Sequence, residues 1–417
     1  MSRLFADLRT RLLPITLTQL VGLACGIAGV KLSSQLIAPA DFGRYGVFLT
    51  FTPLGMSVVH AGLAKFTARH WAGADDKSLL WREIIRPASA KLPWLLLAAA
   101  LAALLMAGRE WLGLLPFIFF AAAFLSYGSL AQVALQADRR HWADFFISAV
   151  GSPTRSFLPP LFYWASGGTM VALYGGYTLH ALAFAAIALW ILPARARPQP
   201  IQPAIPTLLP AVYAGPMFNL LAVTGWTLTG LNRWLVALFF GVTTTGYFTL
   251  ANNIAMIVPA MLGAMLTQYF QPVFFAAPHA TAEERRSLAH RVDRVASLFW
   301  LTALGGLVAL RFAMPWLTGT LIDAKYSEAG GFVLPAGCFF VATITAQFYH
   351  QLLLAGNRES ACGPVDLIFA GCLTAGCLVA AVFGLGHFTN WLMLTPALPW
   401  LLSRPLARHY LFKPVSA

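Results

Sequence analysis

Apolar stretches long enough to cross a lipid bilayer follow one another along most of this 417-residue chain. A hydrocarbon core about 30 Å thick requires about 20 helical residues for each crossing. The sequence therefore predicts about twelve transmembrane helices, at residues 12–36, 43–66, 91–108, 112–136, 143–164, 169–192, 208–239, 245–274, 293–314, 331–355, 362–385 and 389–407. A succession of this kind predicts an all-α polytopic membrane protein.

The composition supports this class and excludes most soluble ones. Apolar residues make up 59% of the chain and charged residues only 10%, and the mean hydropathy is +0.70. An ordinary soluble domain has about a quarter charged residues. So few charges cannot cover the surface of a globular protein of this length, whereas lipid can cover an apolar one.

The basic residues collect in every second connecting segment. If the N-terminus is inside, the inner segments are 1–12, 67–91, 137–142, 193–207, 275–294, 356–361 and the C-terminal tail. With Lys65 and Arg404 near helix ends, they hold 21 of the 28 basic residues. The positive-inside rule then predicts that both termini are cytoplasmic. A net charge of +13 would suggest nucleic acid in a soluble protein. Here the positive charge is interpreted as a topology signal that lies beside anionic lipid. Membrane lipid is therefore expected as a partner, and nucleic acid is not.

Several kinds of chemistry are not indicated. The sequence has no phosphate-binding G-x-x-x-x-G-K-[ST] run, no H-E-x-x-H and no Cys/His metal pattern. The five cysteines lie in or beside apolar spans, in an odd number and without metal-type spacing, which favours packing roles. The N-terminal apolar run continues to about Leu36 without a cleavage site, so an uncleaved first helix is expected. No cofactor, no metal and no enzymatic activity are predicted.

The chain divides into two related halves. The Pro-rich segment 193–207 separates them, which predicts a six-helix lobe at residues 1–200 and another at 201–417. The run LIAPADFGRYGVF at 36–48 parallels FFGVTTTGYFTLA at 239–251 and puts Gly43 opposite Gly246, at an offset of 203. An even number of crossings in each half predicts parallel repeats, as in transporters whose lobes rock about a substrate. The amphipathic segments 67–91 and 275–294 are expected to lie along the cytoplasmic interface.

Charges inside apolar spans are the candidate site residues, because each costs about 2.5–3.5 kcal/mol on insertion scales. Lys31 and Arg233 occupy nearly matched places in the two halves and could bind one anionic ligand; the alternative is that each extends to the outer headgroups. Arg155, followed by helix-breaking Pro159 and Pro160, is either a cavity-lining cation or a partner of a carbonyl or of Asp144. Asp366 is either a proton or sodium coupling site or an ion-pair partner.

Amide side chains supply a second set of candidates. Amides can bind sugar hydroxyls, although in membranes they often hold helices together. The amides considered as sugar contacts are Gln35, one turn after Lys31, Asn252 in the eighth predicted helix, and Gln347 and Gln351 around His350.

Several short motifs resemble those of a known protein family. Residues 35–45, QLIAPADFGRY, resemble the R-L-L-G-P-x-D-[FY]-G-x-Y turn of polysaccharide flippases, the O-antigen and lipid-linked oligosaccharide branch of the MOP (MATE-like) exporter superfamily. Gly215-Pro216, Asn232-Arg233 and Gly246-Tyr247 are similar to that family's G-x-P, D-R and G-x-Y run. Two positions depart from the pattern: Gln35 replaces the usual Arg, and Asn232 replaces the usual Asp.

The resemblance implies a flippase of the bacterial inner membrane. It would move undecaprenyl-pyrophosphate-linked oligosaccharide from the cytoplasmic to the periplasmic leaflet by alternating access, for lipopolysaccharide O-antigen or a similar surface polysaccharide. A polysaccharide polymerase and glycosyltransferases are candidate partners. Lys31, Arg155 and Arg233 would bind the pyrophosphate. The alternatives are a MATE-type multidrug antiporter, which would favour acids in its cavity, and a membrane glycosyltransferase or polymerase, which the short external loops disfavour.

Overall fold

The structure, a computed structural model, describes residues 13–107, 111–192, 224–227, 230–274, 281–356 and 358–413. Within these ranges every regular element is a helix. Seven of the described helices are long and apolar enough to cross a membrane, and the number rises to nine if each of two bent helix pairs is one crossing. The prediction of an all-α polytopic protein is thereby confirmed.

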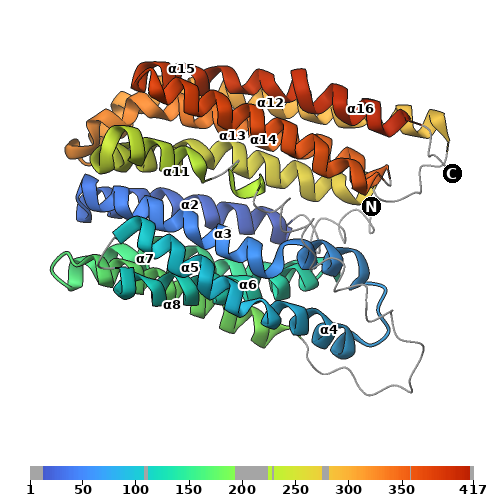
Figure 1. Cartoon of the computed structure of the whole chain (residues 1–417), viewed down its shortest axis with the longest axis horizontal. Coiled ribbons are helices and arrows are strands. Elements are labelled where there is room, and N and C mark those ends of the chain that lie inside the picture. The colour runs from blue at the N-terminus through green and yellow to red at the C-terminus, as the bar shows by residue number, and fades with distance from the viewer. Residues whose placement is uncertain are drawn as a thin grey trace. The chain divides into compact units, whose positions relative to one another are not determined.

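The elements from the first half of the chain are α2 (Leu13–Leu36), α3 (Pro39–His70), α4 (Lys77–Ala90), α5 (Leu92–Ala107), α6 (Trp111–Ala137), α7 (His141–Ala165) and α8 (Met170–Ile191). The long helices run roughly parallel in Figure 1, and the short helix α4 lies at one end of them. Helix α8 packs against α6 and α7, and α2 packs against α7.

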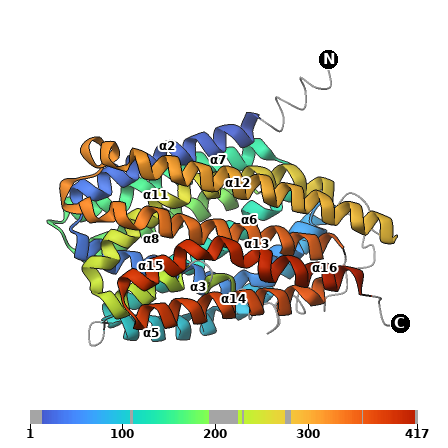
Figure 2. The same ribbon diagram turned by 90° about the horizontal axis from the view of Figure 1, so that it is seen from above.

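The second half has one helix at its centre. Helix α13 (Val333–Ala355) is buried along most of its length and packs against its neighbours on several sides. The elements around it are α11 (Leu231–Phe274), α12 (Ala282–Thr320), η3 (Ala324–Phe332), α14 (Glu359–Val382), α15 (Leu385–Leu394), η4 (Thr395–Ala397), η5 (Pro399–Ser403) and α16 (Arg404–Phe412). Figure 2 labels the α-helices among them.

The predicted crossings coincide with these elements wherever the structure describes them. Each of the twelve overlaps a helix named above, the crossing 389–407 being the run from α15 to α16. The crossing 208–239 lies partly outside the described residues. The Pro-rich segment 193–207 also lies outside them.

By their internal contacts the residues form two compact units. The first holds residues 1–37 and 47–226, and the second holds 38–46 and 227–417. The start of α3 thus belongs with the second unit. The two six-helix lobes proposed from the sequence stay a prediction.

The sequence repeat reappears inside the second unit as a reciprocal backbone contact. A Cβ atom on Gly43 would lie 1.9 Å from the carbonyl oxygen of Val242, and one on Gly246 would lie 1.9 Å from that of Pro39. The two contacts are equivalent in the repeat, because Gly43 corresponds to Gly246 and Pro39 corresponds to Val242 at the same offset of 203. Only glycine allows so close an approach, which brings Cα–H groups into hydrogen-bonding range of carbonyl oxygens.

The turns before these two glycines also correspond. Helix α2 ends at Leu36 and α3 begins at Pro39. In α11 the equivalent turn is at Gly241, whose φ of 83° and ψ of 167° interrupt the helix. A positive φ of this size favours glycine. The turn predicted between the seventh and eighth crossings is therefore present at the position of the repeat.

The two amphipathic segments behave differently. Residues 77–90 form the separate helix α4, capped by the Asp76 side chain, with Leu80, Ile84 and Ala88 buried along one face. Residues 282–294, by contrast, are the first turns of α12, which begins at a capping box between Thr281 and Glu284 and continues for 39 residues. Such a helix is about 58 Å long. The described residues of 275–294 thus continue directly into the ninth predicted crossing, and their place along the cytoplasmic interface stays a prediction.

Candidate functional site

The cations of the first unit lie on two tightly packed helices. Lys31 is exposed on α2, and Arg155 is exposed on α7. The helices approach closely beside both residues, since a Cβ atom on Gly29 would lie 2.8 Å from the Cβ of Ser156. Within the described part of the chain neither cation forms an ion pair. Lys31 and Arg155 are therefore accessible positive charges at a similar level of one helix pair.

Helix α7 continues through its prolines. Pro153, Pro159 and Pro160 all lie inside a single helix that runs from His141 to Ala165, so the expected break is not present. Proline still removes the amide that would bond to the carbonyl four residues earlier. The carbonyls of Arg155 and Ser156 are freed in this way by Pro159 and Pro160. The segment is therefore polar at the level of Arg155 although its helix is intact.

A buried histidine lies beside this segment. The Oγ1 atom of Thr154 is 2.9 Å from Nδ1 of His180 on α8 and donates to the carbonyl of Val150 at 2.8 Å. His180 is only 4% exposed. Its role could not be predicted from the sequence, because a histidine inside an apolar run has no spacing that identifies its partner.

Asp144 is not the partner of Arg155. Its carboxylate accepts hydrogen bonds from Gln132 Nε2 at 2.6 Å and from Gln136 Nε2 at 3.2 Å. Both amides come from α6, so this contact joins α6 to α7. The two glutamines thus hold helices together, and Arg155 is left for another role.

Arg233 in the second unit is buried, with 9% of its surface exposed. Its terminal nitrogen is 3.3 Å from Oδ1 of Asn253. In the orientation that satisfies both side chains, the amide oxygen of Asn252 accepts from Arg233 Nε at 2.9 Å and from a terminal nitrogen at 2.7 Å. Asn252 is fully buried. The two asparagines of α11 therefore fix the guanidinium, and Asn252 faces a cation.

The remaining candidates gather on α13 and α14. Oδ2 of Asp366 on α14 is 2.7 Å from Nδ1 of His350 on α13. Gln347 is exposed and Gln351 half-buried on the same stretch of α13, and Oε1 of Gln351 has no hydrogen-bond partner among the described residues. Asp366 is therefore paired with His350, in line with its interpretation as an ion-pair partner. The imidazole of His350 can itself carry a proton.

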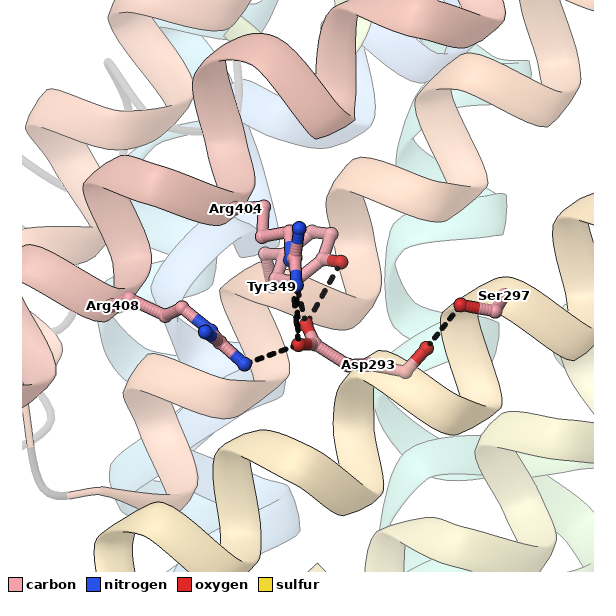
Figure 3. A network of polar contacts seen from close by, with 5 residues as sticks. All are labelled: Asp293, Ser297, Tyr349, Arg404 and Arg408. Carbon is pink, nitrogen blue, oxygen red and sulfur yellow. Dashed lines mark hydrogen bonds and ion pairs between the residues drawn. The ribbon is translucent and has the colours of Figure 1, made fainter.

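A polar network at Asp293 was not expected from the sequence (Figure 3). Arg404 and Arg408 of α16 both reach the carboxylate of Asp293 on α12, Arg404 with a nitrogen–oxygen distance of 3.1 Å. The hydroxyl of Tyr349 on α13 donates to the same carboxylate at 3.2 Å. The guanidinium of Arg404 also lies over the ring of Trp400, 5.6 Å from its centroid. The network ties three helices together around one acid.

The sequence of most of these elements matches a known protein family. The family described as "Polysaccharide biosynthesis protein" matches residues 34–329, well over half of the chain. The chain belongs to this family. No curated protein matches the sequence.

Solved structures show the same fold. An inward-facing MATE multidrug resistance transporter of the MOP superfamily has a TM-score of 0.62 at 14% identity, covering 95% of this chain and 96% of its own. A lipid II flippase, MurJ, has a TM-score of 0.63 at 10% identity, covering 97% and 87%. A MOP transporter from Pyrococcus furiosus, described as having a binding pocket of reverse polarity, has a TM-score of 0.51 at 14% identity, covering 97% and 96%.

These similarities confirm the family and the fold class predicted from the sequence. The protein is a multi-pass membrane protein of the polysaccharide biosynthesis family with the fold of MOP-superfamily transporters. The roles of the individual site residues, Lys31, Arg155, Arg233 and Asp366 among them, stay predictions.

Proposed function

We propose that this protein flips undecaprenyl-pyrophosphate-linked oligosaccharide from the cytoplasmic to the periplasmic leaflet of a bacterial inner membrane. The product would enter a cell-surface polysaccharide such as O-antigen. In this proposal both termini are cytoplasmic, and the lobes 1–200 and 201–417 alternate between inward- and outward-open forms. Membership in the polysaccharide biosynthesis family supports the process, and the shared fold supports the mechanism.

One observation carries the choice of an anionic substrate. In the described crossings the acids already have donors: Gln132 and Gln136 for Asp144, and His350 for Asp366. Lys31 and Arg155, by contrast, are exposed and have no acidic partner among the described residues. A pyrophosphate would compensate such charges with strong, charge-assisted hydrogen bonds. Arg233, which the amides of Asn252 and Asn253 contact, is the third proposed contact.

The amides are proposed to bind the sugar. Gln35 and Gln347 are exposed, and Gln351 is half-buried, with an amide oxygen that has no hydrogen-bond partner among the described residues. Each offers donors and acceptors that match hydroxyl groups. Asn252 is proposed to act through Arg233, whose guanidinium it faces.

Coupling to an ion gradient is proposed for the pair of Asp366 and His350. A carboxylate 2.7 Å from an imidazole nitrogen can exchange a proton with it, and the pair is mostly buried. Intramembrane pairs of this kind are frequent in proton relays.

A MATE-type multidrug antiporter is the second candidate, because a MATE transporter shares the fold over nearly the whole chain. Such a protein would bind organic cations and needs available acids. The donors found around Asp144 and Asp366 disfavour it. A membrane glycosyltransferase is disfavoured by the transporter fold.

The test is complementation of a strain that lacks its own flippase. Lys31→Ala and Arg155→Ala should each lower surface glycan while the protein inserts at normal levels. Arg311→Ala, an exposed cation on α12, is the matched control and should restore glycan fully. Normal glycan in both site variants would remove these cations from the substrate site. Export of organic cations by the wild-type protein without glycan export would favour the antiporter.

A further inference from the structure

A groove of about 770 Å³ lies on the first unit, where α6 passes into α7 beside the end of α8. One end of it is basic and the remainder is apolar. Arg139, Arg140 and His141 line the basic end, and Trp142, Phe146 and Trp190 are among the side chains along the rest. We propose that this groove binds an anionic phospholipid. The headgroup phosphate lies against the two arginines, and an acyl chain follows the aromatic side chains.

The two arginines of the basic end are available to bind a phosphate. Arg139 and Arg140 are exposed, and neither forms an ion pair within the described part of the chain. The neighbouring acids are occupied elsewhere: Asp138 binds Lys77 Nζ at 2.7 Å, and Asp144 accepts from the glutamines of α6. Two adjacent guanidinium groups without acids create a local positive potential, and guanidinium matches phosphate geometry.

The start of α7 adds to this potential. Arg140 is the N-cap of α7, and no side chain caps the helix. The first amides of a helix carry a partial positive charge and favour an anion. His141, the first residue of the helix, lines the same end of the groove.

The backbone at Arg139 indicates that its side chain serves a purpose other than folding. Arg139 has a φ of 56°, and among the described residues it is the one non-glycine residue with a positive φ. Its amide donates to the carbonyl of Gln136, and the amide of Arg140 donates to that of Leu135. This pattern ends a helix with a left-handed residue, a position at which glycine is usual. Arginine there places a guanidinium at the groove at a cost to the backbone.

The apolar part is suited to an acyl chain at the membrane boundary. Trp190 is 83% exposed and Phe146 is 55% exposed. Tryptophans mark the headgroup level of a bilayer, where a phospholipid places its phosphate. Residues 137–142 are predicted to be cytoplasmic, and anionic lipids are enriched in that leaflet.

The experiment uses the full-length protein in detergent, titrated with phosphatidylglycerol or with phosphatidylcholine of the same acyl chains. Native mass spectrometry counts the bound lipids. The wild-type protein should bind phosphatidylglycerol more tightly than phosphatidylcholine. The double variant R139G/R140A should bind phosphatidylglycerol about tenfold more weakly than the wild type and should keep its affinity for phosphatidylcholine. The control Arg311→Ala should bind both lipids like the wild type.

Arg139→Gly separates binding from folding. Glycine relieves the left-handed backbone, so this variant should unfold at or above the wild-type temperature while it binds less phosphatidylglycerol. Equal binding of the two lipids by the wild-type protein, or unchanged phosphatidylglycerol binding by the double variant, would overturn the proposal. Displacement by inorganic phosphate, or by undecaprenyl pyrophosphate at equal concentration, would also overturn it by assigning the groove to a free anion or to substrate.

Discussion

Gly43 and Gly246 are packed against each other so closely that neither position has room for a Cβ atom. The two residues are equivalent in the sequence repeat. Gly43 faces the carbonyl of Val242 and Gly246 faces the carbonyl of Pro39, and these two carbonyls are equivalent in the repeat as well. Gly46 and Thr249, one turn further on, keep the same offset, and a Cβ on Gly46 would lie 2.2 Å from Thr249 Oγ1. The glycines of the repeated motif therefore have a physical role, which is to let two backbones approach closely.

Gly43→Ala should destabilise the protein. The added methyl group meets a backbone carbonyl rather than a side chain that can move away, so the loss should be at least about 1–3 kcal/mol, the usual range for overpacking. Thermal unfolding of the purified protein measures it. Gly26→Ala is the control, since a Cβ there has open space around it. Equal unfolding temperatures for the two variants would contradict the contact.

Removing Arg233 should affect both stability and transport. Arg233→Ala leaves the buried amide of Asn252 without its donor, which costs about 1–3 kcal/mol. We expect a lower unfolding temperature together with reduced surface glycan. Asn253→Ala, which removes one longer contact, should have a smaller effect on stability. Full export by Arg233→Ala would show that the guanidinium only supports packing.

Asp366→Asn should slow transport driven by an imposed ion gradient. Asparagine has nearly the same shape but does not ionise, so the hydrogen bond to His350 can remain while proton exchange is lost. Flipping in proteoliposomes with and without a gradient separates the two effects. Rates that respond to the gradient as in the wild type would remove Asp366 from the coupling mechanism.

Asp293→Ala should destabilise the second unit without acting on substrate. It leaves Arg404 and Arg408 without their acceptor, and a hydrogen bond to a charged group contributes about 1.5–3 kcal/mol. Arg294→Ala, an exposed cation next to Asp293 on α12, is the control. An unfolding temperature equal to that of the control would show that the network in Figure 3 contributes little.

Local signals predicted most of the fold. Hydropathy gave the crossings, because lipid imposes a length and a composition on every spanning helix. The extension of α12 was missed although the sequence contains its signal, Thr281 and Glu284 at capping-box spacing. The continuity of α7 through three prolines was missed because packing against α8 overrides their local effect.

Long-range partners could not be predicted in the same way. Asp293 and Arg404 are 111 residues apart, and no periodicity connects them. Asp366 was identified because a charge in an apolar span stands out, whereas its partner His350 depends on how α13 packs against α14. Lys31 and Arg155 were found by the same criterion, and their shared level on packed helices became visible only in three dimensions.

Binding of the anionic headgroup tests the account most directly. Purified protein in lipid nanodiscs, titrated with undecaprenyl pyrophosphate, should bind it with an affinity that falls at least about tenfold in K31A/R155A and is unchanged in Arg311→Ala. Equal affinity in the wild-type protein and in K31A/R155A would contradict the claim that these two cations receive the pyrophosphate.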